Sequence, residues 1–202
     1  MARPRSSAQD LALIATFAGF IAALGLVPAF SPFGFPVPVT IQSLGIMLTG
    51  AILGARRGAS AVLLFLALVA LGLPLLSGGR GGLGVFAGPS AGYLIGFPIA
   101  AAVVGWLIHR RGAPYSPVWG FFAMVVGGIA VLYSIGIPVT AWRADLSLWA
   151  AVTGSSLFVV GDLVKALIAA SVAGAVFRAR PDLLPVRRPI TDRRAATADA
   201  VR

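Results

Sequence analysis

The stretch SLFVVGDLVKALIAASVAGAVF, from Ser156 to Phe177, is apolar almost throughout and yet contains Asp162 and Lys165. A membrane-spanning helix needs about 20 predominantly apolar residues, and this stretch is of that length. A spacing of three positions puts the two charged side chains on one face of a helix. An unpaired charge near the bilayer centre costs about 2.5–3.5 kcal/mol or more. The stretch therefore predicts two charges that either lock the helix to its neighbours as an ion pair or bind a polar ligand.

The composition of the whole chain is also that of a membrane protein. Of its 202 residues, 58% are hydrophobic and 11% are charged, against about 25% charged residues in soluble proteins. The chain contains no Glu, no Cys and only one His. Thiol chemistry is thereby excluded, and almost nothing is available to ligate a metal. We expect neither a metal nor a cofactor.

Six apolar segments can be drawn after a short basic N-terminus at residues 1–10. They are Leu11–Ala29, Ile41–Leu53, Ala59–Leu76, Pro89–His109, Val118–Val139 and Ala150–Phe177. The last segment is long for a bilayer, which predicts that it tilts or protrudes. The expected fold is an all-α membrane protein with six transmembrane helices over residues 11–177.

The basic residues fall mainly on one side of this arrangement. Pairs of Arg precede the first segment and lie in two of the turns, and seven Arg lie between Arg178 and Arg202. The opposite side has only Arg80 and Arg143. An excess of Arg marks the cytoplasmic side, so both termini are predicted to be cytoplasmic. The net charge of +10 then reflects topology and not nucleic-acid binding, and residues 178–202 are predicted to form a disordered tail on anionic lipid.

The connectors on the outward side hold most of the Pro, Gly and small polar residues. Irregular backbone at membrane depth survives only where protein or a water-filled cavity satisfies it, so we expect a binding cavity in the outward half. The polar residues Thr40 and Gln42 follow the Pro-rich connector. In the Gly-rich stretch 72–97, the glycines let a ligand approach the backbone closely, Arg80 is a cation, and Tyr93 has an aromatic hydroxyl. The candidate ligand-binding residues are Thr40, Gln42, Arg80, Gly81, Gly82, Tyr93, Asp162 and Lys165. A solvated connector and a flexible loop remain the structural alternatives.

The same Gly-rich stretch contains GPSAG, residues 88–92, which matches the Gly-x-Ser-x-Gly pattern of serine hydrolases. A nucleophilic serine needs a base within hydrogen-bond reach. His109 lies 19 positions after Ser90, which is about 28 Å along a helix. Lys165 is a conceivable base in its place. We expect that the protein is not an enzyme, with an intramembrane serine hydrolase as a remote alternative.

Small residues recur at spacings of four along the first apolar segment, among them Ala15, Gly19 and Ala23. Such stripes let helices approach closely. They predict either a docking surface for a partner subunit or packing within the same chain.

Three segments, in this order along six apolar segments, resemble the BioY family of biotin transporters. These proteins are the substrate-binding S components of energy-coupling factor (ECF) transporters. The segments are VPVTIQSLGIMLTGAILG (37–54), GLPLLSGGRGGLGVFAGPSAGYLIGF (72–97) and FVVGDLVKALIAA (158–170). The family usually has GPTGGYLIGF where this chain has Ser90 and Ala91, which are small-for-small changes.

The resemblance implies an ECF S-component-like bundle in the cell membrane of a bacterium, with a biotin pocket near the outer face. In the family, the Asp and Lys of the GDLVKA motif contact the ligand, and they correspond to Asp162 and Lys165. Family members present their first helix to a transmembrane coupling subunit partnered by two ATPases. Some are proposed to work without dedicated partners, and in that case we expect a homo-oligomer. This chain has no Walker motif, so any ATP hydrolysis lies on another chain.

The expected function is high-affinity biotin uptake, either with an ECF module or alone. The alternative is a self-sufficient carrier for another small vitamin or anion.

Overall fold

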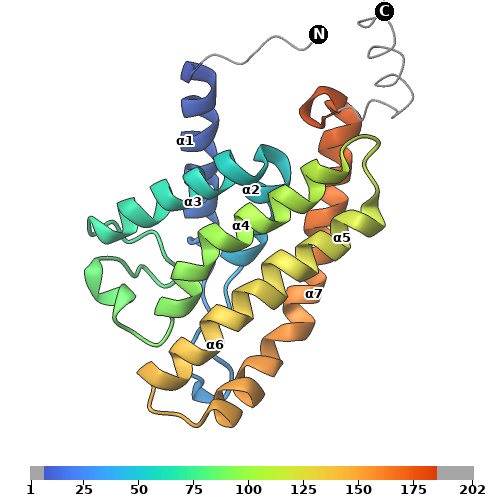
Figure 1. The fold of residues 1–202 in the computed structure, drawn as a ribbon. Helices are drawn as coiled ribbons and strands as arrows, with labels where there is room; N and C mark the ends of the chain where they lie inside the picture. The colour runs from blue at the N-terminus through green and yellow to red at the C-terminus, as the bar shows by residue number, and fades with distance from the viewer. Residues whose placement is uncertain (1–6, 186–202) are drawn as a thin grey trace, which may run out of the picture.

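The computed structural model describes residues 7–185, and in this range the protein is built from helices (Figure 1). The α-helices are α1 (Ser7–Leu24), α2 (Gln42–Leu53), α3 (Ala55–Ala70), α4 (Ala91–Arg111), α5 (Pro117–Val125), α6 (Leu132–Arg143) and α7 (Leu148–Ala179). A π-helical segment, Val126–Val131, joins α5 to α6. Within the described residues, β pairing is limited to two isolated bridges, so the all-α prediction is confirmed there.

Within residues 7–185, four helical segments are long and apolar enough to cross a membrane. They are Ser7–Leu24, Ala91–Arg111, Pro117–Arg143 and Leu148–Ala179. α2 is apolar but has only 12 residues, and α3 has 16 residues with two Arg in its first turn.

The helix boundaries differ from the predicted segments where glycine and proline intervene. α1 ends at Leu24, five positions before the predicted Ala29, and Pro28 follows shortly afterwards. α3 begins at Ala55, because Gly54 has a φ of 81° that breaks the helical path between α2 and α3. α3 also ends at Ala70, before a turn that includes Gly72 and Pro74.

Helix α4 packs against α2, α3 and α6, and small residues allow these contacts to be close. A Cβ atom on Gly50 would collide with the carbonyl group of Ala101 in α4. A Cβ atom on Gly105 would lie 2.5 Å from the carbonyl carbon of Gly54. These close crossings hold the junction of α2 and α3 against the C-terminal half of α4.

Helix α7 is capped by Ser147, whose hydroxyl accepts a hydrogen bond from the backbone N–H of Ala150 at 3.1 Å. The face of α7 that packs inward is rich in alanine, with Ala166, Ala169 and Ala173 fully buried. The helix continues two residues past the predicted end of the bundle. The part of the predicted tail from position 186 onward lies outside the described residues.

The start of α1 and the end of α7 lie at the same end of the molecule (Figure 1). The turn between α4 and α5 lies there too, since the N–H of Ala113 donates to the carbonyl of Pro185 at 3.0 Å. The connector between α1 and α2 and the Gly-rich stretch before α4 lie toward the opposite end of α4. These two connectors form the walls of the site described below.

Candidate functional site

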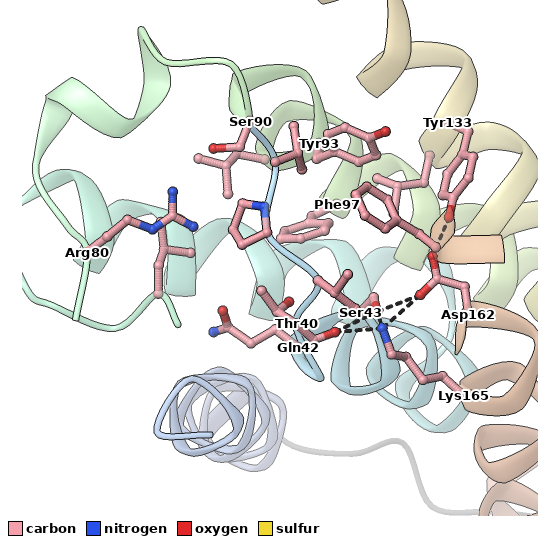
Figure 2. A pocket seen from close by; sticks show the side chains of 17 residues that line it. Thr40, Gln42, Ser43, Arg80, Ser90, Tyr93, Phe97, Tyr133, Asp162 and Lys165 are labelled. Carbon is pink, nitrogen blue, oxygen red and sulfur yellow. Dashed lines mark hydrogen bonds and ion pairs between the residues drawn. The ribbon is translucent and has the colours of Figure 1, made fainter. Parts of the chain in front are cut away.

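A cavity lies between the connector that follows α1, the first half of α4, and helices α6 and α7 (Figure 2). Its lining is mostly apolar with a few polar groups, as is usual for small-molecule sites. The polar and charged side chains on it include Thr40, Gln42, Ser43, Arg80, Ser90, Tyr93, Tyr133, Asp162 and Lys165. The structure thus brings together the predicted ligand-binding residues, with Gly81 and Gly82 as exceptions.

The Asp162 carboxylate stands at the centre of a hydrogen-bonded cluster near the middle of α7. Its side chain is 8% exposed, and its Oδ1 lies 2.8 Å from Lys165 Nζ. Oδ2 accepts a hydrogen bond from the Tyr133 hydroxyl at 2.5 Å, and Oδ1 accepts a longer one from Ser43 at 3.4 Å. A carboxylate has about four lone-pair sites, so these three donors leave about one for a further donor.

The Lys165 ammonium group has a partner for each of its three protons. Besides Asp162, Nζ donates to the carbonyl oxygen of Thr40 at 2.7 Å and to Ser43 Oγ at 3.2 Å. Lys165 therefore connects α7 to the connector and to the first turn of α2. Thr40 takes part through its backbone carbonyl.

Arg80 contributes a second positive charge on the opposite side of the cavity from the Asp162–Lys165 pair (Figure 2). Its Nε donates to the carbonyl oxygen of Ser77 at 3.3 Å, and no ion pair to Arg80 occurs among residues 7–185. Partial burial lowers the pKa of the guanidinium from its usual value, but an arginine pKa starts so high that the group stays charged near neutral pH. Arg80 is thus a cation available to an anionic group in the cavity.

Aromatic side chains form part of the cavity wall. The rings of Tyr93 and Tyr133 meet edge to face with centroids 6.0 Å apart, and the Tyr93 hydroxyl is 3.2 Å from Ser155 Oγ. Phe158 of α7 packs edge to face on Phe35 of the connector, with centroids 5.4 Å apart. The rings of Tyr93, Tyr133 and Phe158 give an apolar body to a cavity whose two ends are charged.

Gln42 lines the cavity, yet its amide is occupied by the protein itself. Nε2 donates to the carbonyl oxygens of Ile21 at 3.1 Å and Leu75 at 3.0 Å. Oε1 accepts from the backbone N–H of Ser77 at 3.1 Å and from its hydroxyl at 3.3 Å. Gln42 therefore ties α1, α2 and the Gly-rich stretch together, and a ligand would have to replace one of these bonds.

Gly81 and Gly82 do not line the cavity, and the structure gives them another role. A Cβ atom on Gly81 would collide with the carbonyl oxygen of Leu73. Gly82 has a φ of 81°, and its N–H donates to the carbonyl of Val69 at 2.7 Å. Both glycines allow the Gly-rich stretch to turn back and pack closely against the end of α3.

Sequence reasoning missed Ser43 and Tyr133, which both contact Asp162. Ser43 follows Gln42 directly and could have been included as part of the same polar pair. Tyr133 carries an aromatic hydroxyl within an apolar segment. The same feature made Tyr93 a candidate, so it could have identified Tyr133 as well. Its direction depends on the π-helical segment just before it, since an extra residue per turn rotates the residues that follow.

The predicted docking stripe is exposed on the described surface of α1. Ala15, Gly19 and Ala23 face outward, whereas Ala18 is 2% exposed. A Cβ atom on Gly19 would have no atom of another segment of residues 7–185 within 4 Å. The stripe is thus not used for packing within the described chain.

The residues of the hydrolase pattern do not form a nucleophile–histidine pair. Ser90 precedes α4, and His109 lies in the last turn of the same helix. His109 Nε2 is 2.9 Å from the carbonyl oxygen of Ala51, so this histidine contributes to helix packing at the far end.

Comparisons with known proteins identify the family of this chain. The model of the BioY family matches residues 1–182. A biotin transporter BioY from Rhizobium etli is 50% identical over 186 residues, covering 90% of this chain and 99% of that protein. Another from Rhodobacter capsulatus is 48% identical over 190 residues, covering 89% and 98%.

A solved structure shares the fold. A crystal structure of the S component for biotin from an ECF-type ABC transporter superimposes with a TM-score of 0.82 at 27% identity, covering 87% of this chain and 95% of that one. The relatives are transporters and not enzymes, so the serine hydrolase alternative has no support. With a family match over nearly the whole chain, relatives up to half identical and a shared fold, the chain belongs to the BioY family.

Proposed function

We propose that this protein takes up biotin across the cell membrane, binding it in the cavity between the connector and helices α4, α6 and α7. The observation that carries the proposal is the buried Asp162–Lys165 pair, which faces an apolar cavity with one lone-pair site left on the carboxylate. Two charges are costly inside a membrane and are commonly functional there. The relatives named as biotin transporters supply the identity of the ligand.

The ureido ring of biotin is proposed to lie against Asp162. The ring has two N–H donors, and a carboxylate accepts such donors strongly. The carboxylate of biotin would be repelled at this position, because Asp162 already carries the negative charge. Lys165 has no unused proton, so its role is to hold Asp162 and the connector in place.

The valerate carboxylate of biotin is proposed to pair with Arg80. The guanidinium lies across the cavity from Asp162 and has no ion pair within the described residues. Its planar donors suit bidentate binding of a carboxylate. The apolar thiophane ring and chain then lie between the two charged ends, beside Tyr93 and Phe158.

The arrangement in the membrane follows from the position of the arginines. We propose six spans in which α2 and α3, about 18 Å and 24 Å long, complete the four longer ones. The ends that carry Arg56, Arg57, Arg110 and Arg111 would be cytoplasmic, together with both termini. The cavity then opens toward the outside, near the start of α4.

Delivery of the ligand to the cytoplasm requires the cavity to open toward the cytoplasmic side of the membrane. We propose that a transmembrane coupling subunit with two ATPases docks on the exposed stripe Ala15–Gly19–Ala23 of α1, since small residues allow close helix approach. Transport by this chain alone, or by a homo-oligomer, is the alternative. Uptake of labelled biotin into vesicles that contain only this chain would favour the alternative.

The proposed ligand is tested on the purified full-length protein. Bound small molecules are released and identified by mass spectrometry, and labelled biotin is then titrated in competition with unlabelled analogues. Desthiobiotin keeps the ureido group and should compete, whereas analogues without that group should not. Failure of desthiobiotin to compete, combined with tight binding of analogues that lack the ureido group, would contradict the proposal.

A further inference from the structure

A groove on the outer surface of α3 and α4 lies apart from the biotin cavity. Its walls are apolar and include Ala59, Leu63, Ile99, Ala102, Val103 and Trp106. Leu63 and Trp106 are about half exposed, at 55% and 50%, while the small side chains of Ala59 and Ala102 leave a trough between larger neighbours. In a membrane such a groove faces the hydrocarbon.

A basic notch borders this groove. The notch shares Trp106 with the groove and is lined by Arg56, Arg57 and Arg110. The Arg110 guanidinium lies 4.8 Å from the centre of the Trp106 ring, and Arg57 is paired with Asp10 at 3.0 Å. In the described part of the chain, neither Arg56 nor Arg110 has an ion pair. Two cations therefore stand at the end of an apolar groove without a counter-ion from residues 7–185.

We propose that the groove and the notch bind an anionic phospholipid. One acyl chain would lie along α3 and α4, and the headgroup phosphate would lie between Arg56 and Arg110. An anionic membrane surface attracts each Arg that lies near it. A tryptophan such as Trp106 is typical of the headgroup level, and the first turn of α3 also favours negative charge.

A protein subunit is the competing occupant of this surface. A phospholipid is favoured because the groove and the notch border each other at Ala55 and Trp106, which line both. One lipid molecule supplies both an apolar acyl chain for the groove and an anionic headgroup for the notch. A transmembrane protein helix would supply the apolar contact, but it would also need a carboxylate at the level of the notch.

Lipid retention by the full-length protein tests the proposal. The protein is placed in nanodiscs of equal phosphatidylglycerol and phosphatidylcholine, released, and examined by native mass spectrometry for the lipid that stays bound. The unchanged protein should retain phosphatidylglycerol preferentially. Arg56→Gln combined with Arg110→Gln should lower this preference about tenfold or more, the effect of losing two such attractions.

The matched control is Arg111→Gln combined with Arg143→Gln, which removes the same charge outside the groove and the notch and should keep the preference. Ala102→Phe fills the trough and should reduce retained phosphatidylglycerol with both notch arginines present. Biotin binding by each variant verifies that it is folded. An unchanged preference in the Arg56/Arg110 variant, or an equal fall in the control, would overturn the proposal. So would a variant that retains lipid normally but no longer assembles with a coupling subunit, because the surface would then belong to a protein.

Discussion

Lys165 joins the last helix to the wall of the cavity, since its Nζ lies 2.7 Å from the carbonyl oxygen of Thr40, 125 positions earlier in the chain. The same Nζ lies 2.8 Å from Asp162. The charged pair thus links the proposed ureido acceptor on α7 to the connector that covers the site. A change in either charge is expected to affect both the ligand contact and the position of the connector.

Asp162→Asn is expected to lower the affinity for biotin about 100-fold, as measured by titration with labelled biotin. The change removes the anionic acceptor, and a hydrogen bond to a charged group contributes about 1.5–3 kcal/mol. It also leaves Lys165 as a partly buried cation without a counter-charge, which lowers stability. Combining Asp162→Asn with Lys165→Met should restore much of the melting temperature but not biotin binding. If the double variant bound biotin as the unchanged protein does, the pair would be only structural.

Tyr133→Phe is expected to weaken biotin binding about tenfold, because Asp162 loses the donor at 2.5 Å that orients it. Tyr115→Phe is the matched control. The Tyr115 hydroxyl donates to the carbonyl of Ala170 at 2.8 Å, away from the cavity, so its loss should lower the melting temperature and leave affinity unchanged. Equal affinities for Tyr133→Phe and the control would show that Tyr133 does not orient the acceptor.

Arg80→Gln is expected to remove the preference for biotin over its uncharged methyl ester. In the unchanged protein the ester should bind more weakly, because it cannot pair with the guanidinium. In the variant the two ligands should bind equally, and the affinity for biotin itself should fall about tenfold. Arg143→Gln, which changes an exposed arginine stacked on Trp142, should leave the preference intact. A variant at Arg80 that still discriminates would place the carboxylate elsewhere.

Gly19→Leu is expected to reduce biotin uptake in cells at least several-fold while leaving biotin binding to the purified protein unchanged. The position has room for a side chain within this chain, so a steric effect must come from a partner on α1. Ser171→Leu adds similar bulk to an exposed position on α7 and should affect neither measurement. Loss of binding together with uptake would mean that the stripe supports the fold of the chain.

Gln42→Ala is expected to destabilise the protein by about 2–3 kcal/mol, measured by thermal unfolding in detergent. The buried amide is 1% exposed, and its removal leaves the N–H of Ser77 and two carbonyl groups without partners. Thr153→Ala removes an exposed hydroxyl that bonds only within its own helix, and should change stability little. A Gln42 variant with native stability and no biotin binding would instead make this residue a ligand contact.

The charged pair on α7 was predictable from sequence because it depends only on local geometry. Residues three positions apart share a helix face whatever surrounds them, and hydropathy over a window of about 20 residues identifies a span without knowledge of its neighbours. The exposed stripe on α1 was visible by the same periodicity. The sequence did not show which face of α1 packs inward, because Ala15 on the exposed face and Ala18 on the buried face have the same side chain.

The partners of the pair depended on the tertiary structure. Ser43 and Tyr133 reach Asp162 from positions 119 and 29 residues away, through helices whose relative rotation is set by close packing and by the π-helical segment. The Gln42 amide could equally have faced a ligand, and only the fold shows that it bonds two other parts of the chain, α1 and the Gly-rich stretch.

The amino-acid sequence by itself determined that the protein lies in a membrane and is all-helical, because both follow from composition and hydropathy. It also determined that two opposite charges share one helix face, because this follows from the periodicity of a single helix. The tertiary structure alone decided which other groups surround those charges and which cation stands across the cavity from them. Such contacts join residues that are distant in the chain, and they exist only once the helices have packed.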